Sequence, residues 1–113
     1  MHQKQKSYYL GILSEWLVIL MLFLTGHRIL KSRFKCRYGE IDIISNKADK
    51  IYFIEVKYRH KNTSEVLTTN QILRIKRSGE FFIAQNSKYQ KSTMIFQLFK
   101  VNKFFLISRF NIL

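Results

Sequence analysis

The sequence has no proline, a single cysteine and only four glycines among its 113 residues. One cysteine cannot form an internal disulfide, and a zinc site would need more ligands than the scattered His2, His27 and His60 supply. We interpret Cys36 as a small side chain on a strand, and a reducing, cytoplasmic location is compatible with it. Because repeats, linkers and low-complexity tracts are also absent, we expect one domain over residues 1–113.

Acidic residues are scarce as well: seven Asp and Glu stand against twenty Lys and Arg, and the formal net charge is +13. An excess of this size implies a polyanionic partner, which is a nucleic acid, an anionic membrane surface or an acidic protein. Three of the few acids, Glu40, Asp42 and Glu55, nevertheless lie within apolar runs. A charge in such surroundings costs free energy unless something pairs with it.

The sequence also lacks an uninterrupted hydrophobic run long enough to span a bilayer. The uninterrupted apolar stretch is Trp16 to Leu24, whereas a transmembrane helix needs about twenty apolar residues. Glu15 precedes that stretch at a depth where a carboxylate is costly in lipid, and no small-x-small cleavage site follows it. We expect a buried helix from Tyr8 to Leu24, ended by Gly26, and no membrane span; a membrane-associated segment is the alternative.

Periodicity predicts the remaining elements. Alternating residues favour strands, and a helical stripe follows a threonine cap at Thr68 or Thr69. The expected elements are strands at 28–37, 40–45 and 51–59, a helix from 68 or 69 to about 85, and strands at 92–101 and 103–110. The order α-β-β-β-α-β-β predicts a mixed α/β domain.

Cations alternate along the first of these strands. If the segment is extended, Lys31, Arg33, Lys35 and Arg37 share one face. Two interpretations remain open: a solvated edge strand protected from aggregation, or a strip that contacts phosphates. In the second case, the full set of nucleic-acid contacts would be Lys31, Arg33, Lys35, Arg37, Arg59, Lys61, Arg74 and Arg77.

A tight turn over residues 47–50 would set the register of the central hairpin. Asp42 would then lie opposite Glu55, and Glu40 opposite Lys57, with the facing side chains about 5 Å apart. The three acids and the lysine would share one face. The other face would carry the core residues Ile41, Ile43, Ile54 and Val56.

Two carboxylates held this close repel each other, and a hard divalent cation removes the conflict. Mg²⁺, or Mn²⁺ in its place, takes one or two carboxylates and leaves its other positions for water and phosphate. A nearby lysine can orient water and offset charge on a phosphate in the transition state. The alternative is a set of structural ion pairs, with Glu40 bound to Lys57.

The motif Gly-Glu-Ile-Asp-Ile-Ile, a short loop and Phe-Ile-Glu-Val-Lys-Tyr-Arg resembles the signature of the YraN family of small bacterial proteins. That family is similar to restriction-endonuclease-like PD-(D/E)-x-K nucleases and archaeal Holliday-junction resolvases. The resemblance implies a mixed β-sheet flanked by helices. It also implies that Asp42 and Glu55 bind metal, that Lys57 is catalytic, and that Glu15 and Glu40 are auxiliary acids.

Two departures from the family pattern are visible. Asn70 stands where the family usually has lysine, and Ile95-Phe96-Gln97 stands where it tends to have Arg-Phe-Asp. Loss of that Arg and Asp bears on substrate contact or strand packing.

These observations leave three functions open. The first is a Mg²⁺-dependent endonuclease acting on DNA, such as branched or damaged DNA, and a homodimer would suit cleavage of two strands. The second is a non-catalytic module that binds DNA, tRNA or the ribosome. The third is a membrane-surface protein that uses the helix from Tyr8 to Leu24.

Overall fold

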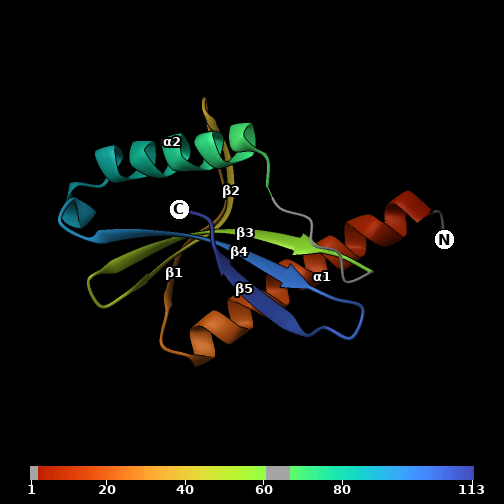
Figure 1. Cartoon of the computed structure of the whole chain (residues 1–113). Helices are drawn as coiled ribbons and strands as arrows, with labels where there is room; N and C mark the ends of the chain where they lie inside the picture. The colour runs from red at the N-terminus through yellow and green to blue at the C-terminus, as the bar shows by residue number, and fades with distance from the viewer. Residues whose placement is uncertain (1–2, 61–66) are drawn as a thin grey trace.

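The computed structural model describes residues 3–60 and 67–113, with side chains from residue 6 onward (Figure 1). Lys61, one of the predicted nucleic-acid contacts, lies outside the described residues. The elements are α1 (Gln3–Leu24), β1 (Arg28–Cys36), β2 (Gly39–Lys47), β3 (Lys50–Tyr58), α2 (Thr69–Gln85), the 3-10 helix η1 (Ser87–Tyr89), β4 (Thr93–Val101) and β5 (Ile107–Asn111). The predicted order of helices and strands is confirmed.

One sheet in the order β1-β2-β3-β4-β5 forms the centre of the molecule. The pair β3–β4 is parallel and the other three pairs are antiparallel. The parallel pair requires a crossover, and α2 supplies it. Helix α1 covers one face of the sheet and α2 lies across the other (Figure 1). This is the mixed sheet flanked by helices that we predicted for a restriction-endonuclease-like domain.

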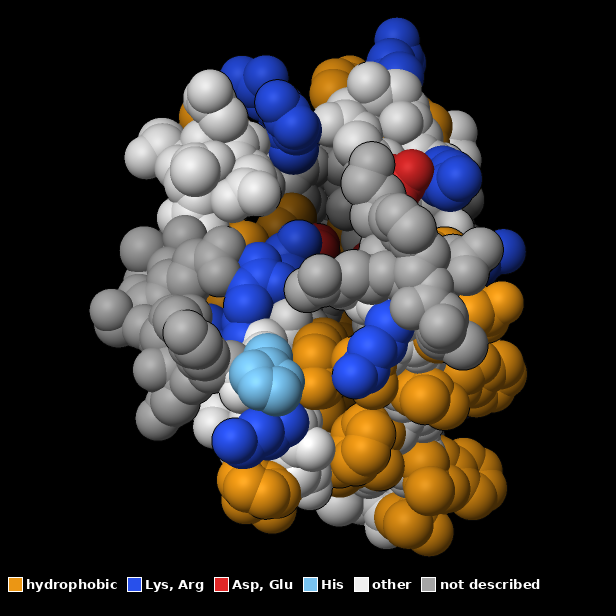
Figure 2. Space-filling model, turned by 90° about the vertical axis from the view of Figure 1, so that its right-hand side faces the viewer, with side chains coloured by type: hydrophobic (Ala, Val, Ile, Leu, Met, Phe, Trp, Pro, Cys, Tyr) orange, Lys and Arg blue, Asp and Glu red, His pale blue; other side chains and the backbone are white. Residues whose placement is uncertain are grey.

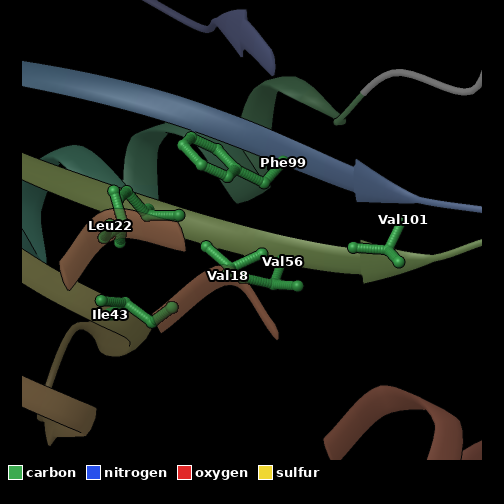
Figure 3. Close-up of a cluster of buried hydrophobic side chains, with 7 residues drawn as sticks. Val18, Leu22, Ile43, Val56, Phe99 and Val101 are labelled. Carbon is green, nitrogen blue, oxygen red and sulfur yellow. The ribbon is translucent and has the colours of Figure 1, made fainter. Parts of the chain in front are cut away.

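The core between α1 and the sheet is aliphatic, apart from one phenylalanine (Figure 3). Its buried members are Val18, Leu22, Ile43, Ile54, Val56, Phe99 and Val101. Helix α1 turns only one side to this core, and Trp16 (64%) and Phe23 (68%) are largely exposed on its outer side. The prediction of a buried helix is therefore correct for one face only. By length and composition α1 could cross a membrane, a test that core helices and signal sequences also pass.

The core between α2 and the sheet contains more aromatic rings. Its buried members are Ile41, Ile44, Ile51, Phe53, Ile75, Phe82 and Phe96. Gly79 lets α2 approach closely, because a Cβ at this position would lie 2.9 Å from Phe96 Cε1. The helix begins with a capping box in which Thr68 accepts from the Gln71 N–H and the Gln71 side chain accepts from the Thr68 N–H.

The central hairpin has the predicted register near its turn. Pairing runs from Lys47–Lys50 to Ile43–Ile54, and Ala48 in the turn has φ 54°. Asn46 stabilises the turn by donating to the carbonyl oxygens of Ala48 and Lys50, at 3.1 and 3.0 Å. Beyond Ile43 and Ile54 the ladder ends, although both strands continue. The predicted acids lie in this unpaired part of the hairpin.

Candidate functional site

Strand β2 changes its facing pattern at Asp42. Between the β1–β2 pairs Ser32–Ile43 and Phe34–Ile41, Arg33 adopts the left-handed φ of 55°. Ile41 consequently packs on the α2 side of the sheet, whereas Ile43 packs on the α1 side. Our prediction that Ile41 and Ile43 share a face is wrong, because regular alternation does not continue through this irregularity.

The Asp42 side chain accepts a hydrogen bond from β3 at the point where backbone pairing between β2 and β3 has ended. Its Oδ2 accepts from the Val56 backbone N–H at 2.8 Å. Burial, together with the nearby Glu55 charge, raises the pKa of Asp42 from 3.8 to about 7, against the lowering effects of the Val56 N–H and Lys57. Asp42 is therefore a half-buried carboxyl group next to a second carboxyl group.

Glu55 completes this pair from the other side of the hairpin. It lies in a hollow of about 280 Å³ beneath α2, whereas Asp42 lies in one of about 350 Å³ beside α1. The two carboxyl groups still hydrogen-bond to each other, because the strands no longer pair between them. Lys57 Nζ is 3.3 Å from Glu55 Oε1, and both side chains are largely shielded from solvent.

Glu15 reaches the same region from α1. Its Oε2 is 3.3 Å from Arg33 Nη2, and its side chain is 18% exposed. Burial raises the pKa of Glu15, the charge of Asp42 raises it further, and Arg33 lowers it. The structure thus brings together three acids from three elements, α1, β2 and β3.

Glu40 lies at the edge of the site and not opposite Lys57 as we predicted. The hairpin ladder ends before it reaches Glu40, whose backbone faces Lys35 in β1. Its side chain is 64% exposed and lies 3.7 Å from Lys35 Nζ. The structural ion pair between Glu40 and Lys57 is absent for the same reason, and Glu40 lines the rim of both hollows.

The carboxyl pair fits a divalent cation. Among residues 3–60 and 67–113, no group of three or more His, Cys, Asp and Glu side chains has the arrangement of a metal site. Asp42 and Glu55 instead offer two adjacent carboxylates, which is the number that Mg²⁺ commonly takes from a protein. Burial is the largest cause of the raised pKa of Asp42, and the Lys57 charge offsets it only in part, so a bound cation would add positive charge that this pair can use.

The predicted cation strip on β1 does not form one row. Arg33 turns to Glu15, Lys35 lies beside Glu40, and Arg37 follows the end of β1. The guanidinium of Arg37 lies 5.4 Å from the centre of the Tyr38 ring. Lys31 is exposed on β1. A register shift between Ile29 and Lys31 contributes to this dispersal.

The other predicted contacts among the described residues lie just after β3 and on α2. Arg74 borders the hollow that holds Glu55, Arg77 is exposed on α2, and Arg59 donates to the Tyr58 carbonyl oxygen at 2.8 Å. Figure 2 shows acidic side chains deep in a hollow, with Lys and Arg side chains around it. The acids are therefore accessible through a basic surface.

Two residues of the site were not predicted. Gln71 borders the Glu55 hollow, and the capping-box spacing Thr68-x-x-Gln71 indicated where α2 would begin. Tyr8 accepts a hydrogen bond from Arg33 and borders the Asp42 hollow. Its position, two helical turns before Glu15, places it on the same face of α1.

Comparisons with known proteins identify the family. The model of "Uncharacterised protein family UPF0102" matches residues 14–113. A UPF0102 protein of Mesorhizobium japonicum is 33% identical over 100 residues, covering 87% of this chain and 80% of that protein. Two others come from Ehrlichia ruminantium (39% over 90 residues; 80% and 71% covered) and Ehrlichia chaffeensis (35% over 99 residues; 88% and 78% covered). The chain therefore belongs to UPF0102, the YraN family.

Proposed function

We propose that this protein binds nucleic acid and hydrolyses its phosphodiester bonds with Mg²⁺ or Mn²⁺ held by Asp42 and Glu55. The observation that carries the proposal is the contact between these two half-buried carboxyl groups beside Lys57. An ion pair alone would not require Asp42, because Lys57 is already paired with Glu55. A second carboxyl group is costly for the fold and useful for binding a cation.

Each side chain has a role in this proposal. The metal would polarise the phosphate and activate water. Lys57, 3.3 Å from Glu55, would orient the attacking water and offset charge that develops on the phosphate. Glu15 would add a third carboxylate, and its ion pair with Arg33 holds it towards Asp42.

Substrate binding would depend on the basic rim. Arg74 borders the same hollow as Glu55, so it can contact a phosphate next to the one that is cleaved. Lys31 and Arg77 would extend that contact along the strand. Such contacts ignore sequence, and we propose DNA as the substrate, with branched or damaged DNA as the form tested first.

A cleavage assay tests the proposal directly. We would incubate wild type with linear, single-stranded and four-way-junction DNA in Mg²⁺ or Mn²⁺, beside Asp42→Asn and Lys57→Ala. The matched controls are Asp49→Asn in the β2–β3 turn and Lys76→Ala on the exposed side of α2. We expect cleavage by wild type and both controls and a loss of at least about 100-fold in the two site variants. Equal behaviour of all five proteins rejects the catalytic proposal.

The second candidate is a binding module without catalysis, and the ion pairs favour it. Glu15, Glu40 and Glu55 each lie within 4 Å of a cation, as structural acids do. A pure binder has no use for the negative charge of Asp42, so Asp42→Asn would bind DNA slightly more tightly and no variant would cleave. Fluorescence anisotropy in EDTA measures this difference.

We place this function in the cytoplasm. The exposed apolar side of α1 would also suit binding to a membrane surface, and the cytoplasmic location therefore needs a test. Cell fractionation separates the two: recovery in the soluble fraction supports the proposal, and recovery with membranes that resists high salt contradicts it.

A further inference from the structure

A second hollow lies at the other end of β3 from the acids. It encloses about 760 Å³ between the end of α1, the β2–β3 turn and strands β4 and β5. Figure 1 shows the end of α1 and this turn at the same edge of the fold. Along β3, Lys50 at the hollow is five residues from Glu55, or about 17 Å. The hollow is thus separate from the carboxyl pair.

Positive charge dominates its lining. Lys47, Lys50 and Arg109 contribute three cations, and Asp49 is the one acid among the lining residues. Within the part of the chain that the structure describes, none of these cations forms an ion pair with a carboxylate. Lys47 Nζ donates to the Thr25 carbonyl oxygen at 2.8 Å, which fixes one ammonium group at the wall.

His27 lies among these cations as a buried neutral group. Its Nδ1 is 3.0 Å from the Ser45 hydroxyl oxygen. Its ring packs edge-on against the Tyr52 ring, with 4.7 Å between the ring centres. Burial lowers the pKa of His27, and the charges of Lys47 and Arg109 lower it further. Both cations are therefore close enough for their fields to reach the imidazole.

The geometry points to a phosphate-binding site: we propose that this hollow binds the phosphate group of a nucleic-acid strand or of a free nucleotide. Lys50 and Arg109 would provide the charge-assisted hydrogen bonds that phosphate prefers. Gln97 and Asn111, joined at 3.1 Å, add amide groups beside the cations, and the volume lies in the range of small-ligand pockets. Of these two phosphate sources, only the nucleic-acid strand depends on the proposed function; binding of a free nucleotide does not.

His27 provides a direct readout. In a variant that carries both His2→Gln and His60→Gln, His27 is the only histidine. Its imidazole proton resonances in NMR spectra then report on the hollow without overlap from other histidines. A bound phosphate would offset the fields of Lys47 and Arg109 and raise the His27 pKa, with Lys50 and Asp49 as the other charged residues of the lining. We would titrate inorganic phosphate, adenosine monophosphate and a short DNA oligonucleotide, with sodium chloride at matched ionic strength as the blank.

Charge substitutions complete the test. We expect Arg109→Gln and Lys50→Gln each to weaken phosphate binding by about tenfold, and Lys76→Gln on α2 to leave it unchanged. Both site residues are exposed enough to be replaced without loss of fold, which the amide spectrum checks. No response of His27 to any probe beyond the chloride blank, or equal weakening by Lys76→Gln, overturns the inference.

The experiment separates this inference from the proposed function. Titrations without divalent metal, in an Asp42→Asn background, measure the hollow whether or not the protein cleaves DNA. Phosphate binding in these titrations, combined with no cleavage by wild type in Mg²⁺ or Mn²⁺, supports the inference and rejects the nuclease, and the reverse result rejects the inference alone. Binding of adenosine monophosphate but not of the oligonucleotide assigns the site to nucleotides; a response to both supports the strand as source.

Discussion

Asp42 should make the protein less stable at the pH at which it would work. Its pKa is raised from 3.8 to about 7, so the folded chain holds a proton that the unfolded chain releases. The stability from this carboxyl is fully present below about pH 4 and is lost as the pH rises towards 7. At about 1.4 kcal/mol for each pKa unit, the loss reaches roughly 4 kcal/mol.

The substitution Asp42→Asn isolates this effect. Asparagine cannot ionise, and its side-chain oxygen can still accept from the Val56 N–H. We expect the variant to match wild type at about pH 4 and to exceed its free energy of unfolding at pH 8 by roughly 2–4 kcal/mol. The control is Asp49→Asn, which makes the same change at an exposed turn position and should alter stability by less than about 0.5 kcal/mol.

Urea unfolding followed by circular dichroism, at both pH values in EDTA, measures the difference. Adding Mg²⁺ at pH 8 should then stabilise wild type and leave Asp42→Asn unchanged. With a Kd of about 1 mM, about 10 mM Mg²⁺ adds about 1.4 kcal/mol. A variant less stable than wild type by the same amount at both pH values would refute the reasoning, because the carboxylate would then be favourable in the fold.

Three further predictions concern packing, capping and charge. Gly79→Ala places a Cβ 2.9 Å from Phe96 and 3.3 Å from Phe53, so we expect a net loss of roughly 1–2 kcal/mol in urea unfolding despite better helix propensity. An unchanged midpoint would contradict this packing. Thr68→Ala removes the capping bond to Gln71 and should cost about 1 kcal/mol in the same assay, whereas no loss would indicate that water replaces the cap. DNA affinity, measured by anisotropy, should fall at least tenfold between about 50 and about 200 mM salt, and a flat response would exclude phosphate contacts as its main source.

Much of the fold follows from local patterns. Alternating residues located the first four strands, whereas the predicted strand at 103–110 begins only at Ile107, after a turn in which Phe105 has φ 58°. Thr68 and Gly26 marked helix ends that the structure confirms. The turn residues fixed the hairpin register from Lys47–Lys50 to Ile43–Ile54. These features depend on neighbours in sequence, so the sequence contains the information needed to predict them.

The geometry of the candidate site could not be predicted from such local sequence patterns. It depends on Arg33 in a left-handed conformation, which sequence gives no reason to expect for an arginine. The prediction of regular alternation therefore placed Ile41 on the wrong face and Glu40 opposite the wrong strand. The prediction that Asp42 and Glu55 lie close together nevertheless agrees with the structure, although it assumed one shared face and a continuous ladder. The two side chains approach from different sides of the hairpin, and they can meet because the β2–β3 ladder has already ended at Ile43 and Ile54.

Asp42 accepts a hydrogen bond and, in the proposed function, also binds a cation, and an alanine substitution cannot separate these two tasks. Where the ladder ends, the Val56 N–H needs an acceptor, and a buried unpaired N–H would cost about 1–3 kcal/mol. That task needs an oxygen atom but no charge, whereas binding a divalent cation needs the charge. Asp42→Ala removes both, so lost cleavage in that variant could follow from damage to β3. Asp42→Asn keeps the acceptor and removes the charge. Cleavage lost in the asparagine variant, in a fold made more stable, can follow only from the missing negative charge.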